Sequence, residues 1–175
     1  MDADQLRQLQ APLKARYRTE PEAAQLRSVA RAQLLPHRPA CRIETRGGPI
    51  EAGLHPLAGG DGQDACSMDM LLEAMVACAG VTFNVVATAM GIPYRSVEVV
   101  AEGEGDMRGT LGVDRSVPVG ATALRLRFEV DSPATDEQLA TLVRQTERYC
   151  VILQTLQHPP PVGVTLQRVE AGAPG

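Results

Sequence analysis

The chain has 175 residues, a formal net charge of −4 and a pI near 5.4, with no Trp and only five other aromatic residues. This length suits one domain with a sizeable core, perhaps extended by an appended segment. The acidic balance and the shortage of stacking side chains argue against a nucleic-acid partner. The first residues, MDADQLRQLQ, lack the apolar core of a secretory signal, so we expect a cytoplasmic protein.

Four cysteines are too few for a disulfide scaffold in a chain of this length: Cys41, Cys66, Cys78 and Cys150. No CxxC motif occurs, and each of the three histidines stands beside a proline, at a position typical of loops. A zinc site needs tighter spacing of Cys and His, so we expect no metal site.

Residues 1–35 are predicted to form a helical N-terminal extension, broken or turned near Tyr17–Pro21. Leu6, Leu9 and Leu13 recur at helical spacing. The segment is also basic, through Arg7, Lys14, Arg16, Arg18, Arg27 and Arg31. These charges indicate a solvated face on a helix packed against the body, with a docking arm for an acidic partner as the alternative.

The stretch CRIETRGGPIEAGL predicts two short strands joined at Gly47-Gly48. In such a hairpin Arg42 and Arg46 share one face of the first strand, and Cys41 lies on the other. A glycine-rich loop, HPLAGGDGQD, follows at 55–64. It lacks the known phosphate-binding patterns, so we expect a flexible connection into the next element.

A long helix is predicted from Ser67 to the glycine and proline at Gly91 and Pro93. Asp69 and Glu73 are its only charged residues, and the segment is apolar almost all round, which is typical of an enclosed helix. Polar residues interrupt it and no second span exists, so we expect no membrane span.

Three alternating stretches then predict strands: 96–102, 107–113 and 124–130. A capping box at 135–138 opens a second helix, Asp136 to Arg148. A short helical turn follows Cys150, and Val164 with Leu166 suggests a last strand. This order predicts an α+β domain with helices against antiparallel sheet. One small sheet would not cover the long apolar helix, which points to a homodimer.

Two of these segments resemble one protein family. The run SMDMLLEAMVACAGVTFNVVATAMGI is similar to the central helix of the OsmC/Ohr family, and LVRQTERYCVILQTL is similar to its second cysteine helix. The glycine loop and the hairpin match in order, so the resemblance covers about 41–169. It implies an OsmC-like domain over 36–175, with antiparallel sheets wrapped around two core helices in an intertwined homodimer.

The resemblance also implies thiol-dependent reduction of organic hydroperoxides or hydrogen peroxide. By position, Cys78 would be the peroxidatic thiol and Cys150 the resolving thiol, with no bound cofactor and an external thiol or dithiol as reductant. The family pairs an Arg from its first strands with a Glu at the start of the central helix. Arg42 or Arg46 would supply the first. Met68 occupies the glutamate position, and Asp69 follows directly.

If Cys78 is the peroxidatic thiol, its thiolate must be stabilised. The thiolate is the nucleophile, and Cys78 lies in mid-helix, where we expect no helix N-terminus to assist it. Burial would raise its pKa, so we expect a cation from another segment, Arg42 or Arg46, oriented by Asp69 or Glu73.

Three alternatives stay open. Cys66 could replace Cys150 as resolving thiol. The chain could be a non-catalytic, ligand-binding dimer of the OsmC fold, or a redox sensor whose Cys78–Cys150 oxidation alters a partner docked on the N-terminal arm.

Overall fold

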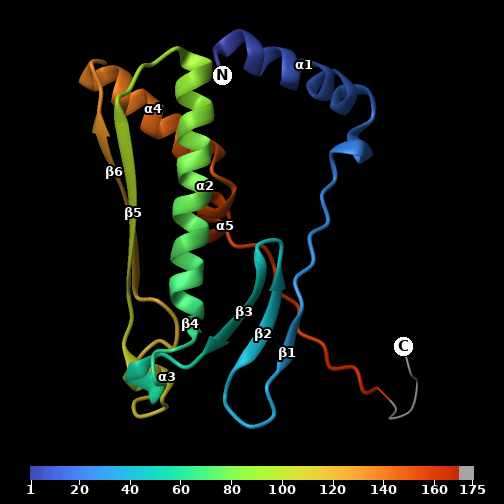
Figure 1. The fold of residues 1–175 in the computed structure, drawn as a ribbon, viewed down its shortest axis with the longest axis vertical. Helices are drawn as coiled ribbons and strands as arrows, with labels where there is room; N and C mark the ends of the chain where they lie inside the picture. Colours follow the sequence, from blue (N-terminus) through green and yellow to red (C-terminus); the bar gives the residue numbers. More distant parts are fainter. Residues whose placement is uncertain (170–175) are drawn as a thin grey trace.

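In the computed structural model of the protein, which describes residues 1–169, the chain forms helices and two β-sheets (Figure 1). The helices are α1 (Ala3–Thr19), α2 (Ser67–Met90), α3 (Met107–Thr110), α4 (Asp136–Tyr149) and α5 (Val151–Gln157), with 3₁₀ turns η1 (Pro21–Ala24) and η2 (Pro56–Ala58). The strands are β1 (Ala32–Leu34), β2 (Cys41–Thr45), β3 (Gly48–Gly53), β4 (Ala65–Cys66), β5 (Ser96–Glu104) and β6 (Ala123–Asp131). The predicted α+β class is confirmed.

The two sheets lie on different sides of α2 (Figure 1). One has the order β1-β2-β3-β4, and the other is the pair β5-β6. All neighbours are antiparallel except β3 and β4, which run parallel. The prediction of purely antiparallel sheet is therefore wrong at β4. This short strand follows a loop of about ten residues, and such a connection can return the chain in the same direction.

The predicted hairpin is confirmed, with Thr45 opposite Gly48 at its turn and Cys41 opposite Ala52 at its open end. Gly48 has a φ of 113°, a value that a side chain would disfavour. Arg38, just before β2, forms ion pairs with Glu51 of β3 and with Asp64 ahead of α2. These pairs fix the sheet against the loop that leads into α2.

The long central helix is confirmed as α2, and Gly91 ends it in the left-handed conformation at φ 65°. Its buried residues Met75, Ala79, Phe83 and Ala87 recur every four positions, so they form one stripe. Phe83 stacks on Phe128 of β6, with ring centroids 5.1 Å apart. By length and composition α2 could cross a membrane, but this stripe packs against β5, α4 and α5.

Strands β5 and β6 confirm two of the three predicted strands, and the third is wrong. Residues 107–113 instead form α3 and a turn. The Asp106 side chain accepts a hydrogen bond from the Arg108 N–H and so caps this short helix. Gly112 then takes a φ of 68°, which a strand cannot accommodate.

The second predicted helix is α4, and its capping box between Thr135 and Gln138 is present. Cys150 alone separates α4 from α5, with extended backbone angles of −73° and 107°. The predicted last strand is wrong: residues 159–169 form no regular element, and Val164 and Leu166 are exposed.

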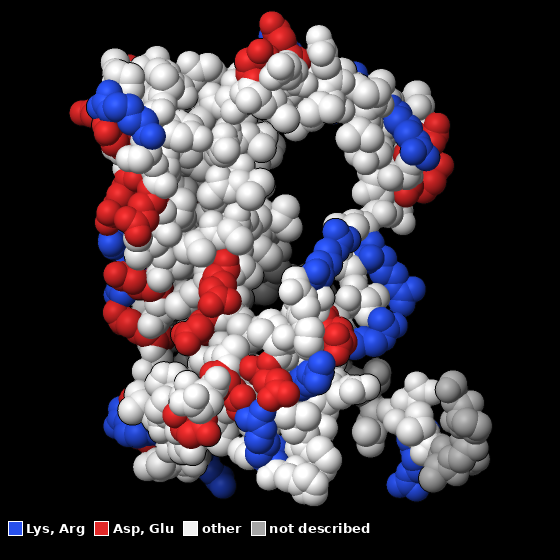
Figure 2. Space-filling view, in the orientation of Figure 1, with Lys and Arg blue, Asp and Glu red and all other residues white. Residues whose placement is uncertain are grey.

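The N-terminal extension is helical only in its first half. A capping box of Asp2 and Gln5 begins α1, whereas residues 25–31 are extended and lead into β1, which pairs with β2. The helix predicted after Pro21 is therefore wrong beyond η1. This arm, α2 and the β1–β4 sheet surround an open space through the molecule (Figure 2).

Candidate thiol site

The structure brings Cys78 and Cys150 together. Cys78 lies at the middle of α2, and Cys150 is fully buried at the joint between α4 and α5. Both α4 and α5 pack on α2, which places the joint beside the middle of the helix. The Cys150 thiol lies close enough to Cys78 to lower its pKa as a hydrogen-bond donor, and the two cysteines are not joined by a disulfide. Two segments separated by 72 residues thus meet at a pair of sulfur atoms.

The surroundings of Cys78 favour its thiolate. Burial acts to raise its pKa, but hydrogen bonds from the Ile152 N–H, the Cys150 thiol, the Val151 N–H and the Thr82 hydroxyl together outweigh burial, so its pKa is lowered. Val151 and Ile152 are the first two residues of α5, where N–H groups have no partner within the helix.

The expectation that no helix N-terminus assists Cys78 is therefore wrong. Assistance does come from another segment of the chain, as the physical argument requires, but α5 supplies it through backbone N–H groups.

Cys150 has the opposite tendency. Burial is the largest effect and raises its pKa, and donation of its S–H to Cys78 raises it further. Backbone N–H groups of Leu153 and Ile152 oppose this rise without cancelling it. The pair is thus polarised, because Cys78 ionises first and Cys150 holds its proton. Such opposite tendencies suit a nucleophilic thiol and a resolving thiol.

The two candidate arginines lie elsewhere in this chain. Arg42 faces Glu44 at 3.4 Å on the exposed side of β2, and Arg46 lies in the hairpin turn. The groups that act most strongly on the pKa of Cys78 include no arginine.

Asp69 is also separated from Cys78. The two positions are nine residues apart on α2, which is about 13 Å along the axis and two and a half turns, so they lie on opposite sides of the helix. Asp69 instead borders a separate cleft of 460 Å³, together with Cys66 and Met68.

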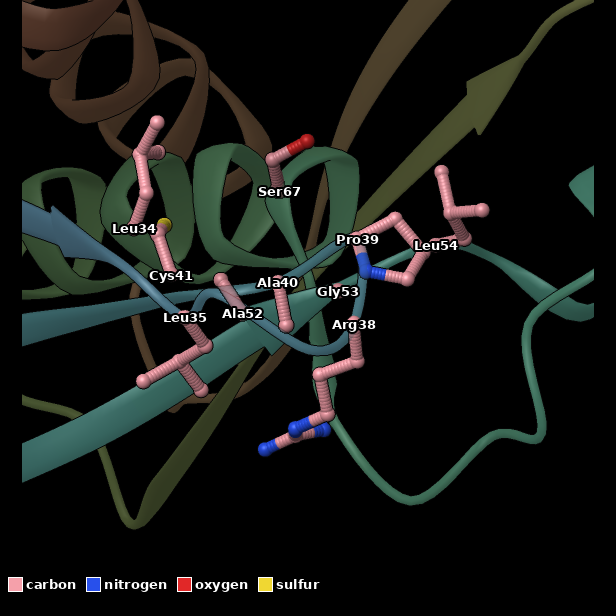
Figure 3. Close-up of a pocket in the computed structure, with 10 residues that line it drawn as sticks. All are labelled: Leu34, Leu35, Arg38, Pro39, Ala40, Cys41, Ala52, Gly53, Leu54 and Ser67. Atoms are coloured by element: carbon pink, nitrogen blue, oxygen red, sulfur yellow. The ribbon is translucent and has the colours of Figure 1, made fainter.

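The remaining thiols are remote from the pair. Cys66 precedes the first residue of α2, about 18 Å along the helix axis from Cys78, so it cannot serve as its resolving partner within one chain. Cys41 lines another pocket, of 390 Å³, between β2, β3 and the start of α2 (Figure 3). In this pocket Arg38 points away from Cys41.

A larger, mostly apolar groove of 760 Å³ lies between α1, α2 and α4, and neither Cys78 nor Cys150 lines it. Thr82, which bonds Cys78, and Tyr149, which precedes Cys150, both line it. Its walls also contain Val81, Val85 and Met90 of α2. An elongated apolar molecule in this groove would contact Thr82 and Tyr149, which are neighbours of the two thiols.

Sequence reasoning missed three groups at this site. Thr82 lies four residues after Cys78, on the same face of the helix, so helical spacing could have identified it. The N–H groups of Val151 and Ile152 carry no side-chain signal. Only the start of a helix directly after Cys150 hints at them.

Comparison with known proteins places this site in a family. The sequence model of the family described as OsmC-like protein matches residues 60–165, which include both cysteines. A search of curated proteins found no match.

Solved structures share the fold. An OsmC-like protein from Mycoplasma pneumoniae is 19% identical with a TM-score of 0.63, over 77% of this chain and 89% of that one. The organic hydroperoxide resistance protein OsmC from Legionella pneumophila is 15% identical with a TM-score of 0.59, over 77% and 93%. The organic hydroperoxide resistance protein OhrB from Bacillus subtilis is 18% identical with a TM-score of 0.51, over 75% and 93%. The OsmC-like fold is therefore confirmed.

Proposed function

Because the chain belongs to the OsmC-like family, we propose that it is a thiol-dependent peroxidase that reduces organic hydroperoxides or hydrogen peroxide. The observation that carries the proposal is the polarised pair of Cys78 and Cys150, in which α5 lowers the pKa of Cys78. Two of the similar solved proteins have names that refer to organic hydroperoxide resistance, which supports the same chemistry.

The reaction proceeds in three steps. The Cys78 thiolate attacks the terminal oxygen of the hydroperoxide, the O–O bond breaks, and the departing alkoxide takes a proton to become an alcohol. Cys78 is now a sulfenic acid. The Cys150 thiol then forms the Cys78–Cys150 disulfide and releases the sulfenic oxygen as water. A dithiol reductant opens this disulfide by exchange, is itself oxidised, and restores both thiols.

The groove beside the thiols favours bulky substrates. Its walls are mostly apolar, so the alkyl part of a lipid hydroperoxide would leave water on binding, whereas hydrogen peroxide has no apolar surface to bury. We infer a preference for alkyl or lipid hydroperoxides.

The enzyme is proposed to act as a homodimer in the cytoplasm, where thiols are kept reduced. It would need no bound cofactor, only the external thiol or dithiol reductant. Because Arg42, Arg46 and Asp69 do not reach Cys78 within one chain, their proposed role requires a second copy. An arginine from its hairpin would hold the thiolate, and Asp69 would orient that arginine.

A second candidate function rests on the same groove. A volume of 760 Å³ with apolar walls is also suited to holding a small molecule without turnover. In that case the chain would be a ligand-binding or redox-sensing dimer of the OsmC fold.

One experiment separates the candidates. Consumption of an organic hydroperoxide with a dithiol is measured for the wild type, Cys78→Ser and Cys150→Ser, with Cys66→Ser as control. Turnover should be lost in the first variant, strongly reduced in the second and unchanged in the control. Mass spectrometry of peroxide-treated protein should find the Cys78–Cys150 disulfide. A wild type with neither turnover nor this disulfide would contradict the peroxidase proposal.

A further inference from the structure

Helix α1 has one apolar face, and most of it is uncovered. Leu6, Leu9, Leu13 and Tyr17 recur at spacings of three and four, so they share that face. Leu6 is buried where α1 meets α2. Leu9 is 60% exposed, Leu13 48% and Tyr17 40%. The apolar face therefore begins on the chain's own body and continues over the open space.

A helix with this sequence needs cover. Pro12 lies inside α1, where it removes one backbone hydrogen bond and crowds the preceding turn, so it weakens the helix. Isolated helices of this length are marginal in water even without a proline. The Asp2 capping box and the Leu6 contact support only the first turns. The last turns need a partner against their apolar side chains.

Helix α2 presents a second uncovered face on the same open space. Ala77, Val81, Val85 and Ala89 follow each other at intervals of four, and all are exposed, Val81 by 68%. Their small side chains allow another helix to approach closely. The same four-residue spacing leads back to two exposed acidic residues near the start of α2, Asp69 and Glu73. Because this row turns by about 40° at each step, Asp69 lies on a different side of the helix from Val85. The buried stripe of α2 is covered by its own chain, whereas this face is not.

The charges of these two regions are complementary. Four basic residues of the arm make no ion pair within residues 1–169, and neither do the two acids of α2: Lys14, Arg18, Arg27, Arg31, Asp69 and Glu73. Figure 2 shows acidic side chains over the lower half of α2 and basic side chains on the opposite rim of the open space. One chain thus carries a basic surface and an acidic surface that do not pair with each other within that chain.

Residues 1–34 are held to the rest of the described chain only near their two ends. Leu6 packs at one end and β1 pairs with β2 at the other, while residues 24–31 between them are exposed. Ordering an unpacked backbone costs conformational entropy, so such a segment needs contacts that residues 1–169 of the single chain do not supply.

We propose that residues 1–34 are a clasp that closes over a second copy of this chain. The Leu9–Leu13–Tyr17 face packs on the exposed apolar face of the other copy's central helix, and the basic arm lies along its acidic end. The contact is reciprocal, because both copies carry both surfaces. This inference rests on the proposed homodimer and assigns the N-terminal extension, which lies outside the family match at 60–165, a role in it.

The clasp has a consequence for the thiol site. Leu6, Gln10 and Lys14 of α1 form one wall of the groove that reaches Thr82 and Tyr149. A second copy held under α1 closes the open side of this groove. Access to Cys78 then depends on the assembled dimer.

The test compares two double variants that add the same charges to opposite faces of α1. Leu9→Asp with Leu13→Asp changes the apolar face, and Gln8→Asp with Ala15→Asp changes the other face. All four positions are exposed, so both variants should fold. Sedimentation equilibrium should show self-association weakened by more than about tenfold in the first variant and unchanged in the second.

A second measurement uses the wild type alone. Hydrogen exchange of the amides in residues 13–19 should slow as protein concentration is raised through the dimer dissociation constant. Equal dimer affinity in both double variants, or equal weakening in both, would overturn the clasp. So would amide exchange that is independent of concentration. A wild type that is monomeric at all concentrations would overturn the clasp together with the dimer.

The two proposals fail separately. A clasp-dependent dimer that consumes no hydroperoxide would leave the clasp standing and refute the peroxidase. An active peroxidase whose self-association is unchanged by the substitutions on the apolar face of α1 would refute the clasp and leave the peroxidase proposal standing.

Discussion

The body of the molecule and its N-terminal frame hold their shapes by different means. The body, made of α2, α4, α5, β5 and β6, contains nearly all of the fully buried apolar side chains, including Phe83 and Leu142. In the frame, made of α1, the arm and strands β1–β3, only Leu6 and Ala52 are buried among the apolar residues. Backbone pairing and exposed ion pairs hold the rest of the frame.

This difference indicates what each region can do alone. Burial of apolar surface is the dominant stabilising effect in folding, so the body has the means to fold by itself. Exposed ion pairs contribute little, and short strands are marginal without a packed face. The frame therefore has less apolar burial of its own to stabilise it than the body has.

The largest expected difference between the two regions comes from truncating one large apolar side chain in each region. Phe83→Ala should lower the free energy of unfolding by about 3 to 5 kcal/mol, because Phe83 is 1% exposed and stacks on Phe128. Leu34→Ala in β1 should change it by less than about 0.5 kcal/mol, because Leu34 is 84% exposed. Urea denaturation at low protein concentration measures both. Similar losses would show that the frame has a core of its own.

A smaller effect is expected at the thiols of the body. In Cys150→Ala the thiol donor to Cys78 is lost, so the pKa of Cys78 should rise and its alkylation at neutral pH should slow severalfold. The measurement is the rate of iodoacetamide labelling of Cys78 against pH, whose midpoint should move upward. Cys150→Ser keeps a donor and should stay closer to the wild type. An unchanged midpoint in Cys150→Ala would remove Cys150 from the activation of Cys78.

The smallest difference between the two regions is expected from their ion pairs. Arg38→Ala removes the pairs to Glu51 and Asp64 and should lower stability only slightly, because the arginine is 40% exposed. The matched Arg95→Ala removes the exposed pair to Asp131 in the body. Hydrogen exchange should speed up within the β2–β3 hairpin only in the first variant. A global loss in Arg38→Ala would mean that body and frame unfold as one unit.

The sequence predicted best where local and tertiary signals agree. Capping residues, uninterrupted helical spacing and a closing glycine predicted α2 and α4, and alternation predicted β5 and β6. Residues 107–113 also alternate, but Gly109 lies so close to Pro118 that a β-carbon would be 2.3 Å from its carbonyl oxygen. Only the folded chain reveals that constraint, and it favours a turn.

The candidate site could be predicted only in part, because some of its groups are not marked by any residue type. The contexts of Cys78 and Cys150 are visible in the sequence, and the structure places the two side by side. The donors from α5 are backbone atoms, so no residue type marks them. The sequence does not show that Arg42, Arg46 and Asp69 lie away from Cys78, because their positions depend on how the hairpin and α2 are arranged in the folded chain.

The single residue between α4 and α5 has a mechanical consequence. Cys150 is both the C-cap of α4 and the N-cap of α5, so its backbone angles set the angle between the two helices. A sulfur drawn into a bond with Cys78 would pull on this corner and turn α5. Residues 158–169 follow directly and would turn with it. Oxidation of the two sulfurs to a disulfide would then change the direction of residues 158–169, the exposed segment that follows α5.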